Sequence, residues 1–176
     1  MNTSTTIGVV VALIIAGGAW YWLGSGALST PPLGDYKNTT YMIEGQPVIL
    51  VNGRAETAAA SGSASKIVTQ YFGNEAIGDL NGDGTPDIAF LLSQNSGGSG
   101  TFYYAVAALK TASGYTGTNA VLLGDRIAPQ TTEIREGRLI VNYVERAPGE
   151  PMTTRPSLGV SKYLKLMGTT LIDVQP

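Results

Sequence analysis

From residue 35 onward, apolar residues come in short runs that turn residues separate, a pattern typical of β-strands. The longest run is Thr101–Leu109, which begins with aromatic residues that favour strands. Asn52-Gly53 and Arg135-Glu136-Gly137 predict tight hairpin turns between neighbouring strands. The other predicted strands are Tyr41–Glu44, Pro47–Val51, Asp87–Leu92, Ala120–Leu123, Thr131–Ile134, Leu139–Val144, Tyr163–Leu166 and Thr170–Val174.

One segment between the predicted strands has the spacing of a helix. Its apolar residues fall at positions i, i+1, i+4 and i+5, on one helical face: Ile67, Val68, Tyr71 and Phe72. Ser63 or Ser65 would cap the start of this helix, and Gly73-Asn74 would end it. The sequence therefore predicts an α+β fold, in which a mainly antiparallel β-sheet is accompanied by one or two helices.

A different pattern occupies residues 1–34, where no side chain is charged. Ile7–Leu23 is almost continuously apolar and would form a helix of about 25 Å, the short end of what crosses a bilayer. Trp20, Tyr21 and Trp22 close this run, and such aromatic residues favour the membrane interface. We therefore expect an N-terminal hydrophobic transmembrane helix that anchors the chain.

Two other interpretations of the apolar run remain. It could be a signal peptide cleaved near Ser25-Gly26-Ala27, although no basic residue precedes it. It could also be a buried core helix, although nothing in the run is amphipathic. In the predicted organisation, residues 1–6 are a short tail, 7–23 the transmembrane anchor or signal segment, 24–34 a Gly/Ser/Pro linker, and 35–176 a soluble domain.

The segment Asp79–Asp87 carries the one motif with defined chemistry, D-x-N-x-D-G-x-x-D. Calcium takes six to eight oxygen ligands, and a loop of this kind supplies them from alternate positions around a sharp turn at a glycine, here Gly84. An ordinary tight turn is the alternative, because turns favour the same residues. The predicted metal ligands are the side chains of Asp79, Asn81, Asp83 and Asp87 and the backbone carbonyl of Thr85.

The loop differs from an EF-hand, since position twelve is Phe90 and a predicted strand follows it. The stretch Gly78–Ala89 (GDLNGDGTPDIA) resembles the calcium loops of FG-GAP and integrin-type β-propeller repeats. The resemblance implies a loop that joins two strands and binds Ca²⁺ through the ligands named above. It covers a single copy, so it does not imply a propeller or an adhesion role. The rest of the chain resembles exported bacterial domains that embed one such loop.

Composition narrows the possible functions. The chain has no Cys and no His, which excludes thiol nucleophiles, Ser-His catalysis, zinc fingers and a lipidated cysteine. Its 11 basic and 13 acidic residues give a net charge of −2, which argues against a nucleic-acid partner. Asp125-Arg126 is expected to cap a loop through side-chain hydrogen bonds rather than to line a cleft. We therefore expect a binding or structural role rather than an enzyme.

Together these features predict a membrane-anchored, exported domain with a structural calcium loop. A site without the position-twelve Glu would be weak, at roughly 10⁻⁴–10⁻³ M, and would fill outside the cell. The membrane is the expected partner of the N-terminal helix, with a protein or glycan partner left open, and cleavage of that segment would make the domain secreted. The alternatives are a cell-envelope hydrolase that uses carboxylate acid–base chemistry and a subunit of a surface assembly.

Overall fold

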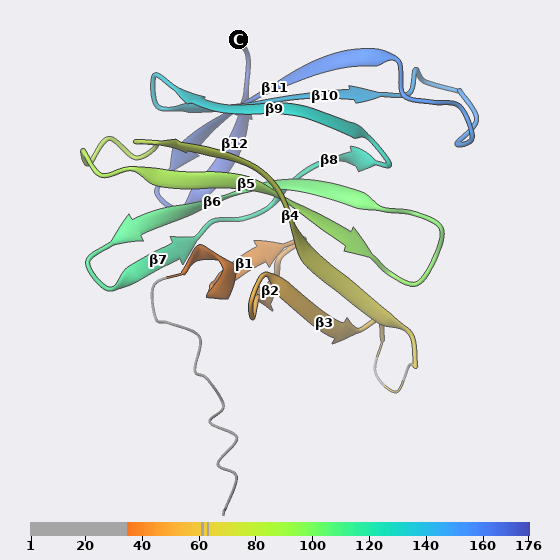
Figure 1. The fold of residues 1–176 in the computed structure, drawn as a ribbon, viewed down its shortest axis with the longest axis horizontal. Coiled ribbons are helices and arrows are strands. Elements are labelled where there is room, and N and C mark those ends of the chain that lie inside the picture. Colours follow the sequence, from red (N-terminus) through yellow and green to blue (C-terminus); the bar gives the residue numbers. More distant parts are fainter. Residues whose placement is uncertain (1–34, 61, 63) are drawn as a thin grey trace, which may run out of the picture.

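The computed structural model describes residues 35–60, 62 and 64–176. In these residues the chain is almost entirely antiparallel β-sheet (Figure 1), and the one helix described is a 3₁₀ turn, η1 (Tyr36–Asn38). The predicted α+β class is therefore wrong. Across the same residues we find no helix with the length and apolarity that a bilayer requires. The predicted anchor at residues 7–23 lies outside the described part of the chain.

The described strands form two sheets and a separate hairpin. The central sheet has the order β3-β4-β5-β6-β7, with β8 also paired to β6; the second sheet has the order β12-β11-β10-β9; β1 and β2 form the hairpin. Their bounds are β1 (Thr40–Ile43), β2 (Gln46–Ile49), β3 (Arg54–Ala58), β4 (Lys66–Gly78), β5 (Asp87–Asn95), β6 (Phe102–Thr111), β7 (Gly114–Gly117), β8 (Val121–Asp125), β9 (Ala128–Arg135), β10 (Arg138–Glu145), β11 (Leu158–Met167) and β12 (Thr170–Val174).

The central sheet is buried on both faces, which explains why residues 88–92 of β5 and most of β6 are apolar without alternation. One face packs against the β9–β12 sheet, and the other is covered by the β1–β2 hairpin (Figure 1). Each fully buried large apolar side chain contributes roughly 1.5–3 kcal/mol to folding. The first layer includes Leu91, Ala105, Leu139, Val141 and Leu164, and the second includes Tyr41, Val48, Leu50, Phe90 and Val106.

The predicted helix after Ser65 is wrong, because β4 occupies this segment. Its first half pairs with β3, and most of its length pairs with β5. The apolar residues with helical spacing are β-branched or aromatic, so strand pairing on both sides outweighs the helical pattern. Gly73 and Asn74, predicted as a helix end, have φ of 108° and 58° and lie where the register with β5 shifts. The same left-handed backbone that ends a helix here makes a bulge that bends the strand.

Beyond this bulge, β4 packs against β9 of the second sheet. The Asn74 side-chain amide donates to the Thr132 hydroxyl at 3.1 Å. Gly78 approaches Ile134 so closely that a Cβ on this glycine would lie 2.8 Å from the Ile134 Cγ2 atom. β4 therefore joins the two layers along one side of the sandwich, and the Asp79–Asp87 segment begins where it ends.

Every predicted strand overlaps an observed strand, and β12 has the predicted bounds, whereas β11 starts five residues before the predicted Tyr163. Both predicted tight turns are also confirmed, since Asn52-Gly53 and Glu136-Gly137 have positive φ at both residues. A third turn of this kind, Glu44-Gly45, replaces the end of a predicted strand. The strands β3 and β7 were not predicted, because their small and polar residues carry no clear apolar alternation.

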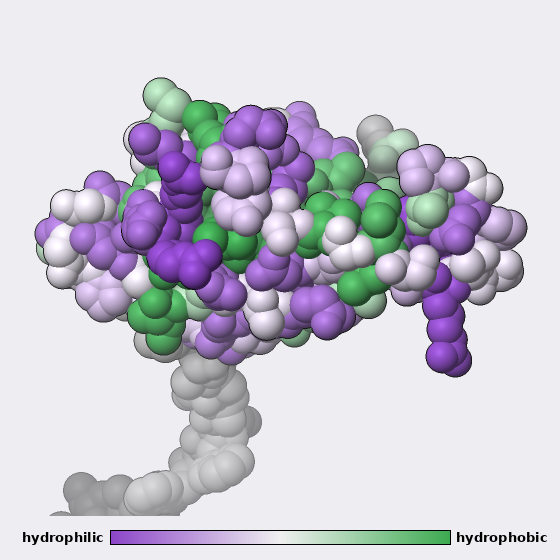
Figure 2. All heavy atoms as spheres, turned by 90° about the horizontal axis from the view of Figure 1, so that it is seen from above, coloured by the Kyte–Doolittle hydropathy of each residue, from purple (hydrophilic) through white to green (hydrophobic). Residues whose placement is uncertain are grey.

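Figure 2 shows the molecule from the side of the β9–β12 sheet. Apolar and polar areas alternate over this face, as expected for an antiparallel sheet with one side toward solvent. The apolar areas are interrupted by polar side chains, so this face presents no single large apolar patch.

Candidate functional site

The Asp79–Asp87 loop connects β4 to β5 at the side of the sandwich where β4 meets the second sheet. Its ends are fixed in the core: Leu80 is 4% exposed and belongs to the layer between the sheets, and Asp87 is fully buried. Residues 81–86 are exposed. The loop therefore presents its polar middle to solvent from a rigid base.

Asp79 organises the interior of the loop. One of its carboxylate oxygens accepts the Gly82 N–H at 2.7 Å, and the other accepts the Gly84 N–H at 2.9 Å. Gly82 and Gly84 have φ of 80° and 82°, a left-handed conformation that glycine adopts without strain. These two glycines turn the backbone so that its amides point at Asp79.

Asn81 and Asp83 are hydrogen-bonded to each other in the same turn. The Asn81 Oδ1 accepts the Asp83 N–H at 2.9 Å, and the Asn81 side-chain amide donates to Asp83 Oδ2 at 2.8 Å. The Thr85 N–H donates to Asp83 Oδ1 at 2.7 Å. The Asn81 amide, and after it the Thr85 N–H, hold the pKa of the Asp83 carboxyl below its ordinary value. Asp83 is therefore an exposed, ionised carboxylate at neutral pH.

Asp87 faces a different environment from the rest of the motif. One of its oxygens accepts the Leu80 N–H at 3.0 Å, and the other accepts the Lys110 N–H at the end of β6 at 2.8 Å. Both amides lie outside the exposed middle of the loop. The Asp87 carboxylate thus ties the start of the loop to the neighbouring strand β6.

The structure brings the predicted ligands into one loop but in two groups. Asp79, Asn81 and Asp83 share the exposed turn, whereas the Asp87 carboxylate is directed at buried amides. Within the described ranges, no three acidic side chains lie close enough together to hold a metal ion. The exposed group still fits calcium chemically, because it offers hard oxygen donors and each bonded carboxylate oxygen keeps a second lone pair.

A second polar cluster joins η1 to β4. The hydroxyls of Tyr36 and Tyr71 both donate to Glu75 Oε1, each at 2.5 Å. The Lys37 ammonium lies 3.9 Å from the centre of the Tyr71 ring. Sequence reasoning missed this cluster, because Tyr36 and Glu75 are 39 residues apart and the segment of β4 was predicted to be helical.

The protonation states of this cluster favour a structural role. Desolvation and then the hydrogen bond to Glu75 raise the pKa of Tyr71 to about 12, and the pKa of Tyr36 is raised for the same reasons. Partial burial acts to raise the pKa of Glu75, but the two tyrosine hydroxyls and Lys37 outweigh it and lower that pKa. Neutral tyrosines and an ionised Glu75 are a stable donor–acceptor set, not a general acid–base pair near pH 7.

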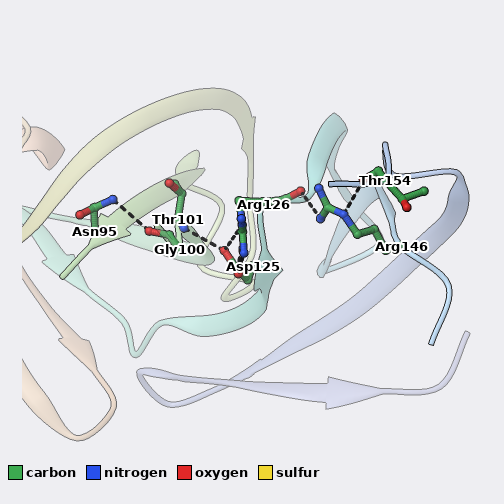
Figure 3. Close-up of polar contacts among 7 residues, drawn as sticks. All are labelled: Asn95, Gly100, Thr101, Asp125, Arg126, Arg146 and Thr154. Atoms are coloured by element: carbon green, nitrogen blue, oxygen red, sulfur yellow. Dashed lines mark hydrogen bonds and ion pairs between the residues drawn. The ribbon is translucent and has the colours of Figure 1, made fainter. Parts of the chain in front are cut away.

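A third network ties together loops at one end of the sandwich (Figure 3). Asp125 accepts the Thr101 N–H at 2.8 Å and pairs with the side chain of Arg126 at 3.0 Å. Arg146 donates to the carbonyls of Arg126 and Thr154 at 3.1 and 2.6 Å. The expected loop-capping role of Asp125-Arg126 is confirmed. Both arginines are committed to loop contacts, so the network holds the loops in place.

No family model, no curated protein and no solved structure matches this chain.

Proposed function

We propose that this chain is an exported binding module, anchored in a membrane by its N-terminal apolar segment and stabilised by a calcium ion in the Asp79–Asp87 loop. The observation that supports the metal most directly is the exposed turn in which the Asp79 carboxylate accepts the Gly82 and Gly84 amides, while Asn81 and Asp83 are hydrogen-bonded to each other. This turn gathers carboxylate and amide oxygens, the hard donors that calcium takes, in one short exposed loop.

In this proposal Asp79, Asn81, Asp83 and the Thr85 carbonyl hold the ion, and Asp87 contributes through the lone pairs that its amide hydrogen bonds leave free. Calcium would supply positive charge that offsets the repulsion among carboxylates in one short loop. Because β4 packs on β9 immediately before the loop, a bound ion would stabilise the junction of the two sheets. The role is structural rather than catalytic.

The exported location is supported by the weakness expected of such a site. A loop without a bidentate Glu at position twelve would have a dissociation constant of roughly 10⁻⁴–10⁻³ M and would be empty at cytosolic calcium levels. The apolar run at residues 7–23 supports attachment to a membrane, with the domain on the calcium-rich side.

Thermal unfolding of the full chain in detergent micelles tests this proposal. With 10 mM calcium and a dissociation constant in the range above, binding linkage gives ~1.4–2.7 kcal/mol of stabilisation. For a chain of this size we expect the melting temperature to rise by about 3–10 °C relative to chelator, and by less in magnesium.

Two variants that each remove one negative charge distinguish calcium binding at the loop from a general effect of ions on the melting temperature. Asp83→Asn should lose the calcium-dependent rise, because it removes an anionic ligand. Glu133→Gln removes an exposed carboxylate from β9 and should keep the rise. An equal rise in calcium and magnesium, or an unchanged rise in Asp83→Asn, would contradict the metal role and leave Asp79–Asp87 as a turn.

A further inference from the structure

β2 and β3 follow each other across the Asn52-Gly53 turn, yet they pair at one position only. Val51 and Arg54 exchange both backbone hydrogen bonds, at 2.9 and 3.1 Å. Beyond this pair β2 stays with β1, and β3 joins the central sheet. A hairpin that continued would next pair Ile49 with Glu56 and then Pro47 with Ala58. A cavity of about 380 Å³ is lined from both strands instead.

The hydrogen bonds on each side show which groups of β3 face this opening. Arg54 bonds Val51, so its backbone N–H and C=O point away from β4. In an antiparallel ladder every second residue points the same way, which places Glu56 and Ala58 with Arg54. The end of β3 shows the same alternation, because the Ala59 N–H donates to the Ser65 carbonyl across the β3–β4 turn and so points toward β4. Glu56 and Ala58 therefore direct both backbone groups toward the side of β2.

The same reasoning applies to the hairpin. The Leu50 N–H donates to the Thr39 carbonyl, so Ile49 points away from β1. The opposite edge of the hairpin is covered, since Met42 exchanges hydrogen bonds with Thr118 and Ala120. In the described part of the chain, no backbone hydrogen bond to another described residue occupies the outward groups of Ile49, Glu56 or Ala58.

The cavity between these two open edges has both aliphatic and polar lining residues. Ile43, Val48 and Ile67 supply its aliphatic surface. Gln46, Gln94 and Glu44 supply polar groups to the lining, and the Glu44 carboxylate accepts the Tyr104 hydroxyl at 2.9 Å. Glu44 forms no ion pair with a described residue. The volume falls within the ~300–1,000 Å³ typical of ligand pockets.

We propose that this cavity is a β-strand addition site, which binds an extended segment of a partner protein along the free edge of β3. Outward backbone groups at every second residue fit an extended chain, as in other peptide-binding sheet edges. The bound segment would place alternate aliphatic side chains in the cavity and a Lys or Arg beside Glu44.

A second copy of this chain is a poorer occupant. If two β3 edges paired, the side chains on the cavity side would be Ala55 and Thr57, which are too small to fill 380 Å³. The exposed charges of Arg54 and Glu56 on the other face of β3, together with Lys66 of β4, oppose edge-to-edge association. A partner segment with larger aliphatic residues would pair with the outward backbone groups of β3 and would also fill the cavity.

The probe is the synthetic peptide acetyl-Lys-Val-Thr-Val-Thr-Val-Thr-amide, titrated into the full chain in detergent micelles. At saturation, hydrogen exchange of the Glu56 and Ala58 amides should slow at least tenfold. Two N-methylated versions of the peptide provide matched controls, because each blocks the amides of one strand edge and leaves the side chains unchanged. The peptide whose methylated amides face β3 should lose at least tenfold in affinity, and the peptide whose methylated amides face away from β3 should not.

Ala58→Pro removes one outward N–H without removing a β3–β4 bond, so it should weaken peptide binding at least tenfold, and Ala58→Ser should bind as the parent does. Unchanged exchange at saturation, equal loss for both methylated peptides, or full binding by a folded Ala58→Pro would overturn the proposal. Exchange that slows with protein concentration alone would overturn it in favour of a second copy. Measurement in calcium and in chelator keeps the result separate from the Asp79–Asp87 loop, which lies outside the cavity.

Discussion

The Asp87 carboxylate accepts two backbone amides from segments that are far apart in the sequence. Leu80 lies near the start of the loop and Lys110 near the end of β6, so the Asp87 side chain at the start of β5 ties the loop to β6. Asp87→Ala would leave both amides without this acceptor in a buried position. Each unsatisfied buried group costs roughly 1–3 kcal/mol, so we expect a loss of about 3 kcal/mol in the free energy of unfolding. Urea unfolding of the full chain in chelator measures this loss without a metal contribution.

Asp83→Ala is the natural comparison for this prediction, because Asp83 belongs to the same motif but is exposed. In chelator it should cost less than about 1 kcal/mol. If Asp87→Ala cost no more than Asp83→Ala under these conditions, the buried hydrogen bonds of Asp87 would not stabilise the fold.

At the level of single residues, the motif predicted where the loop would be and which side chains it would gather. Asp79, Asn81 and Asp83 do share one turn, because their spacing and the two glycines act locally. The buried contact of Asp87 with Lys110 could not be predicted, since it depends on the pairing of β5 with β6. The Tyr36–Glu75 contact could not be predicted either, because the two residues are 39 positions apart in the sequence.

At the level of elements, the strands with strong apolar or β-branched character could be predicted, and β4 could not. Its apolar spacing suits one face of a helix, and Gly73-Asn74 suits both a helix end and a strand bulge. Pairing with β3 and β5 makes this segment a strand and not a helix. That pairing cannot be predicted from the sequence of the segment alone. β3 was missed because its residues are small or charged, as an exposed edge strand allows.

The contact between β4 and β9 gives a prediction for Gly78. A methyl group here would lie 2.8 and 2.9 Å from two carbon atoms of the Ile134 side chain, closer than packed carbons approach. Gly78→Ala should therefore push the strands apart and lower the free energy of unfolding by roughly 1–3 kcal/mol. Thermal unfolding of the full chain in detergent would measure the change.

Gly159 in β11 supplies the control for this substitution. It also lies in a strand, but a Cβ there would have no atom within 4 Å. Gly159→Ala should be neutral or slightly stabilising, because alanine restricts the unfolded chain more than glycine does. Equal destabilisation by both variants would point to a general intolerance of strand glycines and not to the Gly78–Ile134 contact.

On the scale of the whole molecule, apolar clusters hold the three layers together, and a polar contact helps to attach η1. The central sheet and the β9–β12 sheet share an apolar layer, whereas η1 is attached to the central sheet partly through the polar contact of Tyr36 and Tyr71 with Glu75. This contact lies beside Asp35, the residue at which the described chain begins. An ionised Glu75 therefore contributes to the attachment of the N-terminal end of the domain.

Acid should weaken this attachment. The pKa of Glu75 is lowered in the folded protein from an ordinary value of 4.5, so its contribution is complete above that pH and is lost as the pH falls through the lower folded value. Glu75→Gln should cost on the order of 1 kcal/mol at pH 7, from weakened hydrogen bonds, and progressively less below pH 4.5. Urea unfolding of both proteins between pH 3 and 7 measures the difference. Tyr36→Phe removes one donor and should reduce this acid dependence; a difference that stays constant with pH would show that the charge of Glu75 does not contribute to the attachment.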